Sequence, residues 1–120
     1  MFSLFSKRKS RIYAEMERVR QAKKQSSEKS AEEKCLALRD MDMENISVKS
    51  VDGLTLVGHW NPAENPRRTL ICFHGWRGCW YRDFGPMADF LHDHGCNLLF
   101  AEQRSHGSSE GKYIAYGILE

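Results

Sequence analysis

The stretch Thr69-Leu-Ile-Cys-Phe-His-Gly-Trp-Arg-Gly78 decides how the rest of the chain is interpreted. Its unbroken apolar run, Leu70 to Phe73, is typical of a strand buried on both faces of a parallel sheet. The run ends abruptly at His74-Gly75. Loops at the carboxyl ends of such strands hold ligands and catalytic groups, because helices cover both faces of the sheet. The stretch therefore predicts a functional loop directly after a buried strand.

A β-hairpin is predicted before this strand. Apolar residues recur at every second position from Ile46 to Val48 and again from Leu54 to Trp60, on either side of the turn pair Asp52-Gly53. Residues 61–68 contain two prolines, which favours a loop between the hairpin and the strand at 69–73.

A helix and a second strand are predicted after it. We expect Asp83 to be the helix N-cap and Gly95 to mark its end, because the apolar residues between them recur at helical spacing. Asn97 to Glu102 follows as a second buried strand, which completes a β-α-β unit. We expect the strand at 97–102 to form an open sheet edge and therefore predict poor solubility.

The charge is distributed unevenly along the 120 residues. Residues 1–30 carry 9 Lys/Arg and 3 Asp/Glu, a net charge of +6, whereas residues 31–120 carry 9 and 13, a net charge of −4. The composition, 41% hydrophobic and 11% aromatic, is that of a globular protein. The sequence thus predicts a basic extension at residues 1–42, helical or partly disordered, before a domain at residues 43–120.

The extension has only a thin apolar stripe, formed by Ile12, Met16 and Val19. Residues 25–34 are interpreted as a hinge or a frayed helix before a second helical piece at 35–38. Phe and Leu near the N-terminus, followed by four cations, predict a weak membrane-surface contact through residues 1–11, and a solvated basic helix is the alternative. Nucleic-acid binding is not expected, because Glu15 and Glu17 interrupt the basic run.

The cysteines and the apolar runs bear on compartment and metal binding. The four cysteines form no close C-x-x-C pair, no secretory signal precedes them and no apolar run exceeds four residues. These features predict reduced thiols and a cytoplasmic protein, peripheral at a membrane if residues 1–11 dock there. Zinc binding by Cys72, His74 and Cys79 is the alternative considered, but their spacing matches no zinc module, so neither a metal nor a cofactor is expected.

The loop at residues 75–78 has the geometry for either of two uses. A phosphate cradle is disfavoured, because Gly75-Trp-Arg-Gly78 matches neither G-x-G-x-x-G nor a P-loop. An oxyanion hole uses the same geometry, with Gly75 allowing close approach of the backbone and Trp76 donating its N–H.

Two motifs together carry a family resemblance. Phe73-His-Gly-Trp76, followed by Arg104-Ser-His-Gly-Ser-Ser-Glu-Gly111, resembles the α/β-hydrolase superfamily, in particular serine hydrolases of the serine aminopeptidase (S33-like) and lipase/esterase types. The resemblance covers about residues 44–120. It implies the N-terminal part of an α/β-hydrolase fold, a hairpin plus one β-α-β unit of a mostly parallel sheet, ending before the nucleophile elbow.

The resemblance also implies roles for single residues. Trp76 and Gly75 would form part of the oxyanion hole, and the side chains that support the surrounding loops would be His74, Arg104 and His106. The chain departs from the family pattern twice, with Glu102 in place of Asp and Ser105 in place of Gly.

Gly107-Ser-Ser109-Glu-Gly111 matches G-x-S-x-G, the signature of a nucleophile elbow. An elbow requires a buried strand before the first Gly and a helix from the Ser, and neither is predicted here. We therefore expect no catalytic residue in this chain, with the nucleophile, acid and base after Glu120.

The predicted function is that of an incomplete serine hydrolase that acts on a small-molecule ester or amide. The alternative is a non-enzymatic protein that docks on a membrane or a partner through its basic segment.

Overall fold

The computed structural model describes the backbone of residues 2–115 and the side chains of residues 11–28 and 30–115. Two compact units are present, Met1–Ala31 and Glu32–Glu120. The second unit therefore begins earlier than the predicted domain start at residue 43. The membrane contact predicted for residues 1–11 depends on side chains that, except for that of Arg11, lie outside the described ones.

Helix α1 (Phe2–Arg39) is a single continuous helix. The sequence contains no Gly or Pro before Gly53, so nothing in it breaks the backbone hydrogen bonding. The hinge or frayed helix predicted at residues 25–34, and the separate helical piece at 35–38, are therefore wrong. The Ser, Lys and Glu side chains of residues 25–34 are polar, and a helix that is exposed to solvent accommodates them.

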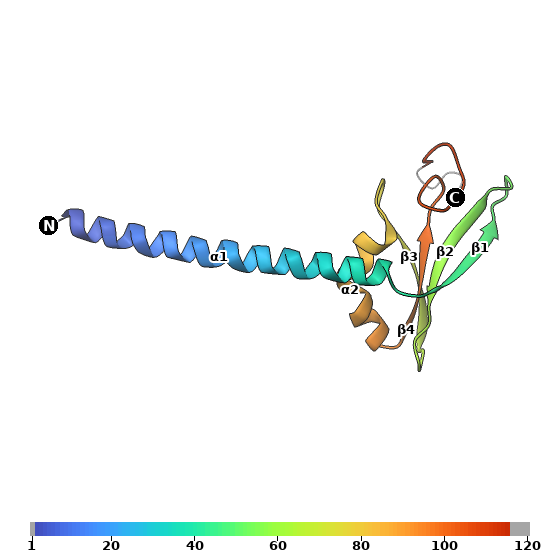
Figure 1. The fold of residues 1–120 in the computed structure, drawn as a ribbon, viewed down its shortest axis with the longest axis horizontal. Helices are drawn as coiled ribbons and strands as arrows, with labels where there is room; N and C mark the ends of the chain where they lie inside the picture. The colour runs from blue at the N-terminus through green and yellow to red at the C-terminus, as the bar shows by residue number, and fades with distance from the viewer. Residues whose placement is uncertain (1, 116–120) are drawn as a thin grey trace. The chain divides into compact units, whose positions relative to one another are not determined.

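The second unit contains one four-stranded sheet in the order β1-β2-β4-β3 (Figure 1). The predicted hairpin is confirmed: β1 (Glu44–Lys49) pairs antiparallel with β2 (Thr55–Asn61). Strand β4 (Cys96–Glu102) pairs antiparallel with β2 and parallel with β3 (Arg68–Phe73). Helix α2 (Trp80–Asp93) connects β3 to β4, which confirms the predicted β-α-β unit.

The core lies between one face of the sheet and the helices. Along β4 every second residue is buried, and the last turns of α1 contribute Leu38 to the same core. Cys35 approaches α2 closely, since a Cβ added at Gly85 would lie 2.5 Å from the Cys35 Cα. The buried core residues are Leu38, Cys72, Trp80, Ala88, Cys96, Leu98 and Phe100.

The other face of the sheet is not covered within the described residues. Ile71 and Phe73 are 57% and 63% exposed, so the prediction that their strand is buried on both faces is wrong. The open edge was also predicted at the wrong strand. Strand β4 lies between β2 and β3, and β3 is the edge, because β4 returns from α2 into the position beside the hairpin.

Helix α2 begins three residues before the predicted N-cap. Its N-cap is Cys79, which makes no side-chain cap hydrogen bond, whereas Asp83 lies in the first turn. The prediction for Asp83 is therefore wrong, because its carboxylate accepts a hydrogen bond from another loop instead. The predicted end at Gly95 is confirmed by its φ of 77°.

Across residues 2–115, no helix combines the length and the apolar character needed to cross a lipid bilayer.

Candidate functional site

The loops that follow β3 and β4 meet at the carboxyl edge of the parallel pair. Gln103 joins them, because its side-chain amide donates to the carbonyl of His74 and its backbone N–H donates to His74 Nε2 at 3.3 Å. Sequence reasoning did not single out Gln103. The carboxyl ends of β3 and β4, where function was predicted, therefore carry two loops that hydrogen-bond to each other.

His74 lies at the centre of this junction. Because its Nε2 accepts a hydrogen bond from Gln103, its proton lies on Nδ1, which donates to the carbonyl of Gly75 at 2.9 Å. Its ring meets the ring of His106 edge-on, with centroids 4.5 Å apart. His106 in turn donates from Nδ1 to the carbonyl of Arg104 at 2.9 Å. Both imidazoles thus hold backbone groups of their own loops.

Residues 75–78 form a tight turn. The N–H of Gly78 donates to the carbonyl of Gly75 at 2.8 Å, and the third residue, Arg77, has a φ of 55°. The N–H of Gly75 donates to Asp83 Oδ2 at 2.6 Å. A Cβ at Gly78 would lie 2.8 Å from the same carboxylate oxygen, so glycine is required for this close approach. One carboxylate on α2 therefore fixes the whole turn.

Trp76 is the second residue of that turn. Its side chain is exposed, and the guanidinium of Arg77 lies 5.0 Å from the centroid of its ring. Asp83 binds the backbone N–H of Gly75, and the backbone N–H of Trp76 is the next one along the turn. The structure thus brings Gly75 and Trp76 together with His74 at the end of β3, as the sequence predicted.

Glu102, at the end of β4, connects three elements. Its carboxylate accepts hydrogen bonds from His59 Nε2 on β2 at 2.8 Å, from Trp80 Nε1 on α2 at 3.1 Å, and from the N–H of Ser108. His59 and Trp80 also stack, with ring centroids 4.3 Å apart. Sequence reasoning missed both partners, because the apolar alternation at Leu54, Leu56 and Trp60 places His59 on the other face of the strand.

The carboxyl of Glu102 has a lowered pKa. Burial acts to raise it, but the hydrogen bond from His59 and the one from the Ser108 N–H outweigh burial and hold the pKa below its usual value. Glu102 is therefore an ionised acceptor that anchors the loop after β4.

Arg104 connects that loop to the β-hairpin. Its guanidinium is buried and binds the carboxylate of Asp52 in a bidentate manner, at 2.7 and 2.8 Å. The Arg104 hydrogen bond, together with one from Ser50, holds the pKa of Asp52 well below its usual range. Ser105, which stands where the family pattern has Gly, adopts a φ of 63°. The departure from the pattern is thus accommodated at the cost of backbone strain.

Ser109 is buried and its hydroxyl is engaged on both sides. The hydroxyl donates to the carbonyl of Glu102 and accepts from the N–H of Val57 at 2.8 Å. No helix begins at Ser109 within the described residues, which end at 115. The geometry that exposes the serine of a nucleophile elbow is therefore absent at this position.

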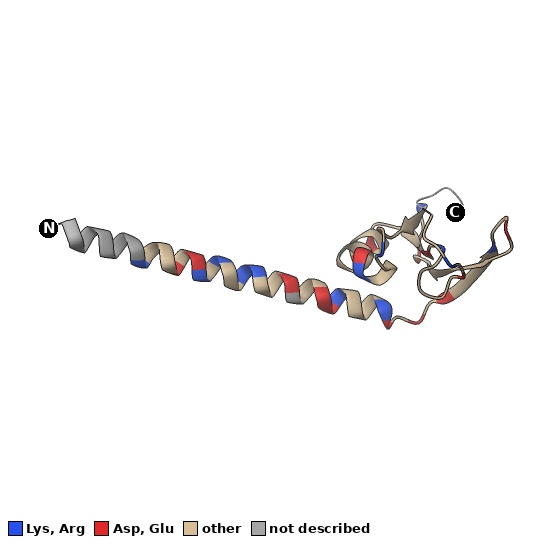
Figure 2. Ribbon diagram, turned by 90° about the horizontal axis from the view of Figure 1, so that it is seen from above, with Lys and Arg blue, Asp and Glu red and all other residues tan. Residues whose placement is uncertain are grey.

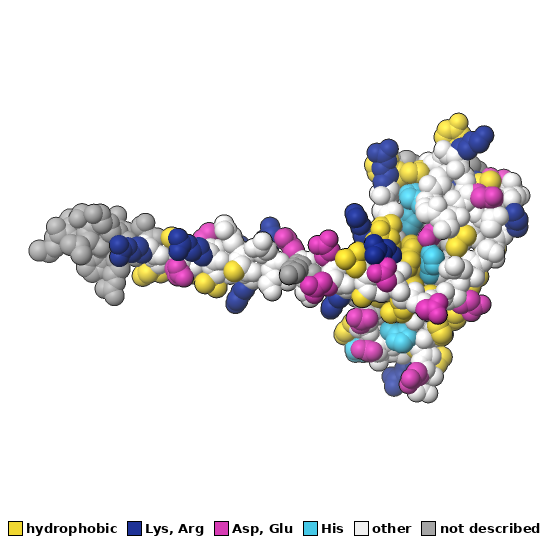
Figure 3. All heavy atoms as spheres, in the orientation of Figure 1, with side chains coloured by type: hydrophobic (Ala, Val, Ile, Leu, Met, Phe, Trp, Pro, Cys, Tyr) yellow, Lys and Arg dark blue, Asp and Glu magenta, His cyan; other side chains and the backbone are white. Residues whose placement is uncertain are grey.

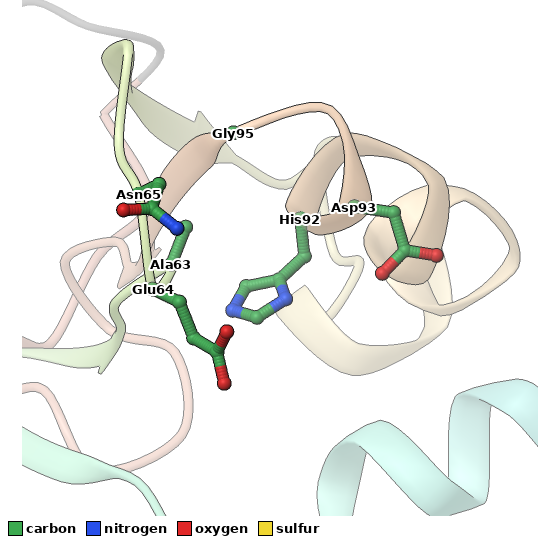
Figure 4. A pocket seen from close by; sticks show the side chains of 6 residues that line it. All are labelled: Ala63, Glu64, Asn65, His92, Asp93 and Gly95. Carbon is green, nitrogen blue, oxygen red and sulfur yellow. The ribbon is translucent and has the colours of Figure 1, made fainter.

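A hollow of about 420 Å³ lies at the amino ends of β3 and β4, opposite the two loops. It is bounded by Ala63, Glu64, Asn65, His92, Asp93 and Gly95 (Figure 4). His92 Nε2 lies 2.8 Å from the carbonyl of Pro62, which ties the end of α2 to the loop after β2. Because catalytic groups of such sheets gather at the carboxyl ends of the strands, this hollow is a weaker candidate than the junction of the two loops.

In the described part of the chain, no three His, Cys, Asp or Glu residues are grouped so that they could hold a metal ion. Cys72, Cys79 and Cys96 are free thiols. Burial, with a smaller effect of Cys96, raises the pKa of the Cys72 thiol, which keeps it protonated and unreactive.

No protein-family model matches this chain, and no curated protein matches it either. Solved structures do resemble it. An esterase from Pyrococcus furiosus superposes with a TM-score of 0.54 at 23% identity, covering 64% of this chain and 30% of the esterase. The α/β hydrolase GrgF from Penicillium sp. sh18 gives a TM-score of 0.50 at 23% identity, covering 60% of this chain and 25% of GrgF. DcsB, in complex with its substrate analogue, gives 0.52 at 20% identity, covering 58% and 24%.

These likenesses establish the fold. The second unit has the architecture of part of an α/β hydrolase, and the chain spans only 24% to 30% of the length of these three structures.

Proposed function

We propose that this chain is the N-terminal portion of an α/β-hydrolase-fold serine hydrolase that acts on ester or amide bonds. In this proposal residues 75–78 form the oxyanion-hole loop, and the nucleophile, acid and base belong to sequence that follows Glu120. The observation that carries the proposal is the hydrogen bond from the Gly75 N–H to Asp83, which fixes this turn at the carboxyl end of β3.

An oxyanion hole works because its donors are held in place before charge develops. Asp83 engages the N–H of Gly75, so Gly75 contributes close approach of the backbone and Trp76 contributes the donor. Gln103 and the Nδ1 proton of His74 hold the same loop from its other side. The chain thus has the features expected of a preorganised donor loop, with His74, His106 and Arg104 as its supports.

The proposed nucleophile is not Ser109. A serine attacks a carbonyl only if its hydroxyl is exposed and a base can take its proton. The buried Ser109 hydroxyl instead binds two backbone groups. Within the proposal, the serine aminopeptidase and lipase/esterase types both fit the two motifs, and the substrate is a small ester or amide.

Intact-mass spectrometry after treatment with a fluorophosphonate probe tests the proposal. A competent serine displaces fluoride and keeps the phosphonyl group, which adds a defined mass. We expect no adduct on residues 1–120 and one adduct on the longer gene product. An adduct on residues 1–120 that disappears in the Ser109→Ala variant would place the nucleophile in this chain and refute the proposal.

A further inference from the structure

The apolar stripe of α1 is exposed in its own unit. Ile12, Met16 and Val19 are 54%, 62% and 50% exposed, although they fall on one face of the helix at spacings of four and three. Tyr13, at the flank of the stripe, is exposed as well. Figure 3 shows apolar side chains between charged ones along this part of the helix. Among the described side chains of unit Met1–Ala31, none covers the stripe.

Cations border the stripe. Arg20 and Lys23 line the same surface as Met16, together with one acid, Glu15. At ~100° per residue, Arg11 and Arg18 fall on one side of the stripe and Lys24 and Glu17 on the other, whereas Glu28 falls on the far side. Figure 2 shows these charged residues along the helix.

The intrahelical ion pairs leave these cations available. Arg18 lies 3.7 Å from Glu15, and Lys24 lies 3.9 Å from Glu28. All four side chains are more than two-thirds exposed, so solvent screens both pairs. Residues 11–24 carry five cations and two acids, a net charge of +3, and an excess of cations beside an apolar stripe is typical of helices that lie in the plane of a membrane surface.

We propose that residues 11–24 of α1 dock on an anionic lipid bilayer, with Ile12, Met16 and Val19 inserted between the headgroups and Arg20 and Lys23 on the lipid phosphates. Tyr13 suits the headgroup level, since its ring is apolar and its hydroxyl is polar. Phe2, Leu4 and Phe5 continue the apolar composition of the sequence toward the N-terminus. The proposal is independent of the hydrolase assignment.

The charge of the segment separates this partner from two others. A second copy of the helix would bring together two copies of residues 11–24, each with a net charge of +3, which repel one another. A nucleic acid would satisfy the cations but would leave the apolar stripe in water. An anionic bilayer satisfies both the cations and the stripe.

Vesicle flotation of residues 1–120 tests the proposal, because bound protein rises with the vesicles whereas aggregates sink. We expect flotation with vesicles of phosphatidylcholine and phosphatidylserine, but little with phosphatidylcholine alone. Salt at 0.5 M should weaken it. Arg20→Gln and Lys23→Gln should each weaken partitioning by about fivefold.

Met16→Glu and Gln21→Glu form a matched pair, since each adds one negative charge, but only the first adds it within the stripe. We expect Met16→Glu to reduce partitioning by at least about tenfold, because it also removes an apolar side chain that inserts into the bilayer. Gln21→Glu should reduce it by no more than about fivefold.

Three results would overturn the proposal. The first is absence of flotation on anionic vesicles. The second is an equal response to the Met16→Glu and Gln21→Glu variants, which would mean that the stripe does not insert. The third is binding of another partner in place of lipid. A second copy would appear as self-association without vesicles that Met16→Glu abolishes, and a nucleic acid would appear as binding of a single-stranded oligonucleotide without flotation.

Discussion

The Asp83 carboxylate on α2 accepts a hydrogen bond from the backbone N–H of Gly75 at 2.6 Å, across eight residues of sequence. This bond connects the first turn of the helix to the turn after β3. Asp83, the residue expected to cap α2, thus fixes the neighbouring loop, and the N-cap position is occupied by Cys79.

Replacing Asp83 should therefore loosen the turn at residues 75–78. Asp83→Ala is expected to lower the free energy of unfolding by about 1 kcal/mol, the value of one hydrogen bond to a charged acceptor that solvent reaches. Asp89→Ala, on an exposed position of the same helix, is the control and should change it by less than about 0.5 kcal/mol. Urea denaturation followed by circular dichroism measures both, and equal effects would deny Asp83 its role.

Glycine should be more stable than alanine at position 105. The φ of 63° at Ser105 is unfavourable for any residue with a Cβ, and the Ser105 hydroxyl donates to the carbonyl of Tyr113 at 2.8 Å. Ser105→Ala loses the hydroxyl and keeps the strain, whereas Ser105→Gly loses both. We expect the glycine variant to be about 1 kcal/mol more stable than the alanine variant in thermal or urea unfolding. A more stable alanine variant would show that strain at this position is negligible.

Glu102 should make stability depend on pH in the acid range. Its pKa is lowered in the folded chain, so its contribution is complete above the unfolded value of ~4.3 and is lost as the pH falls through the folded value. Between pH 6 and pH 3 the wild type should lose more stability than Glu102→Gln, which has no proton to gain there. Urea midpoints at several pH values measure the difference, and parallel curves would contradict this assignment.

The exposed sheet face and the β3 edge should cause self-association. Ile71 and Phe73 are exposed on the uncovered face, and β3 offers an unpaired edge. Ile71→Lys is expected to shift the chain toward monomer in sedimentation velocity at the same concentration. Val51→Lys, at a fully exposed turn position, is the matched control and should change little. Monomeric wild type at high concentration would refute the prediction.

Local sequence patterns predicted the elements better than their environment. The hairpin at residues 44–61 and the end of α2 at Gly95 follow from period-two alternation and glycine chemistry, which act over a few residues. The exposure of Ile71 on β3 did not follow from the sequence, because burial of this residue depends on which elements cover the sheet. An apolar run is the same whether or not they are present.

The candidate site shows the same division. The motif placed His74, Gly75 and Trp76 in one loop, because they are adjacent in sequence. It could not reveal that Glu102 binds His59, 43 residues away, or that Arg104 binds Asp52, 52 residues away. Such bonds depend on strand order and register, which no local pattern encodes.

In the proposed hydrolase the Trp76 N–H stabilises an oxyanion, and removal of that one donor is the most direct test of this role. Trp76 is the second residue of the turn that Gly75 and Gly78 close, a position where proline is well tolerated, so Trp76→Pro deletes the N–H with little change of backbone. Trp76→Ala removes the ring and keeps the N–H. In the proposed hydrolase that continues past Glu120, with an ester substrate, we predict that Trp76→Pro lowers kcat by about 10²- to 10³-fold. Trp76→Ala should stay within about tenfold of wild type. Equal kcat for the two variants, with both folded by circular dichroism, would contradict the claim.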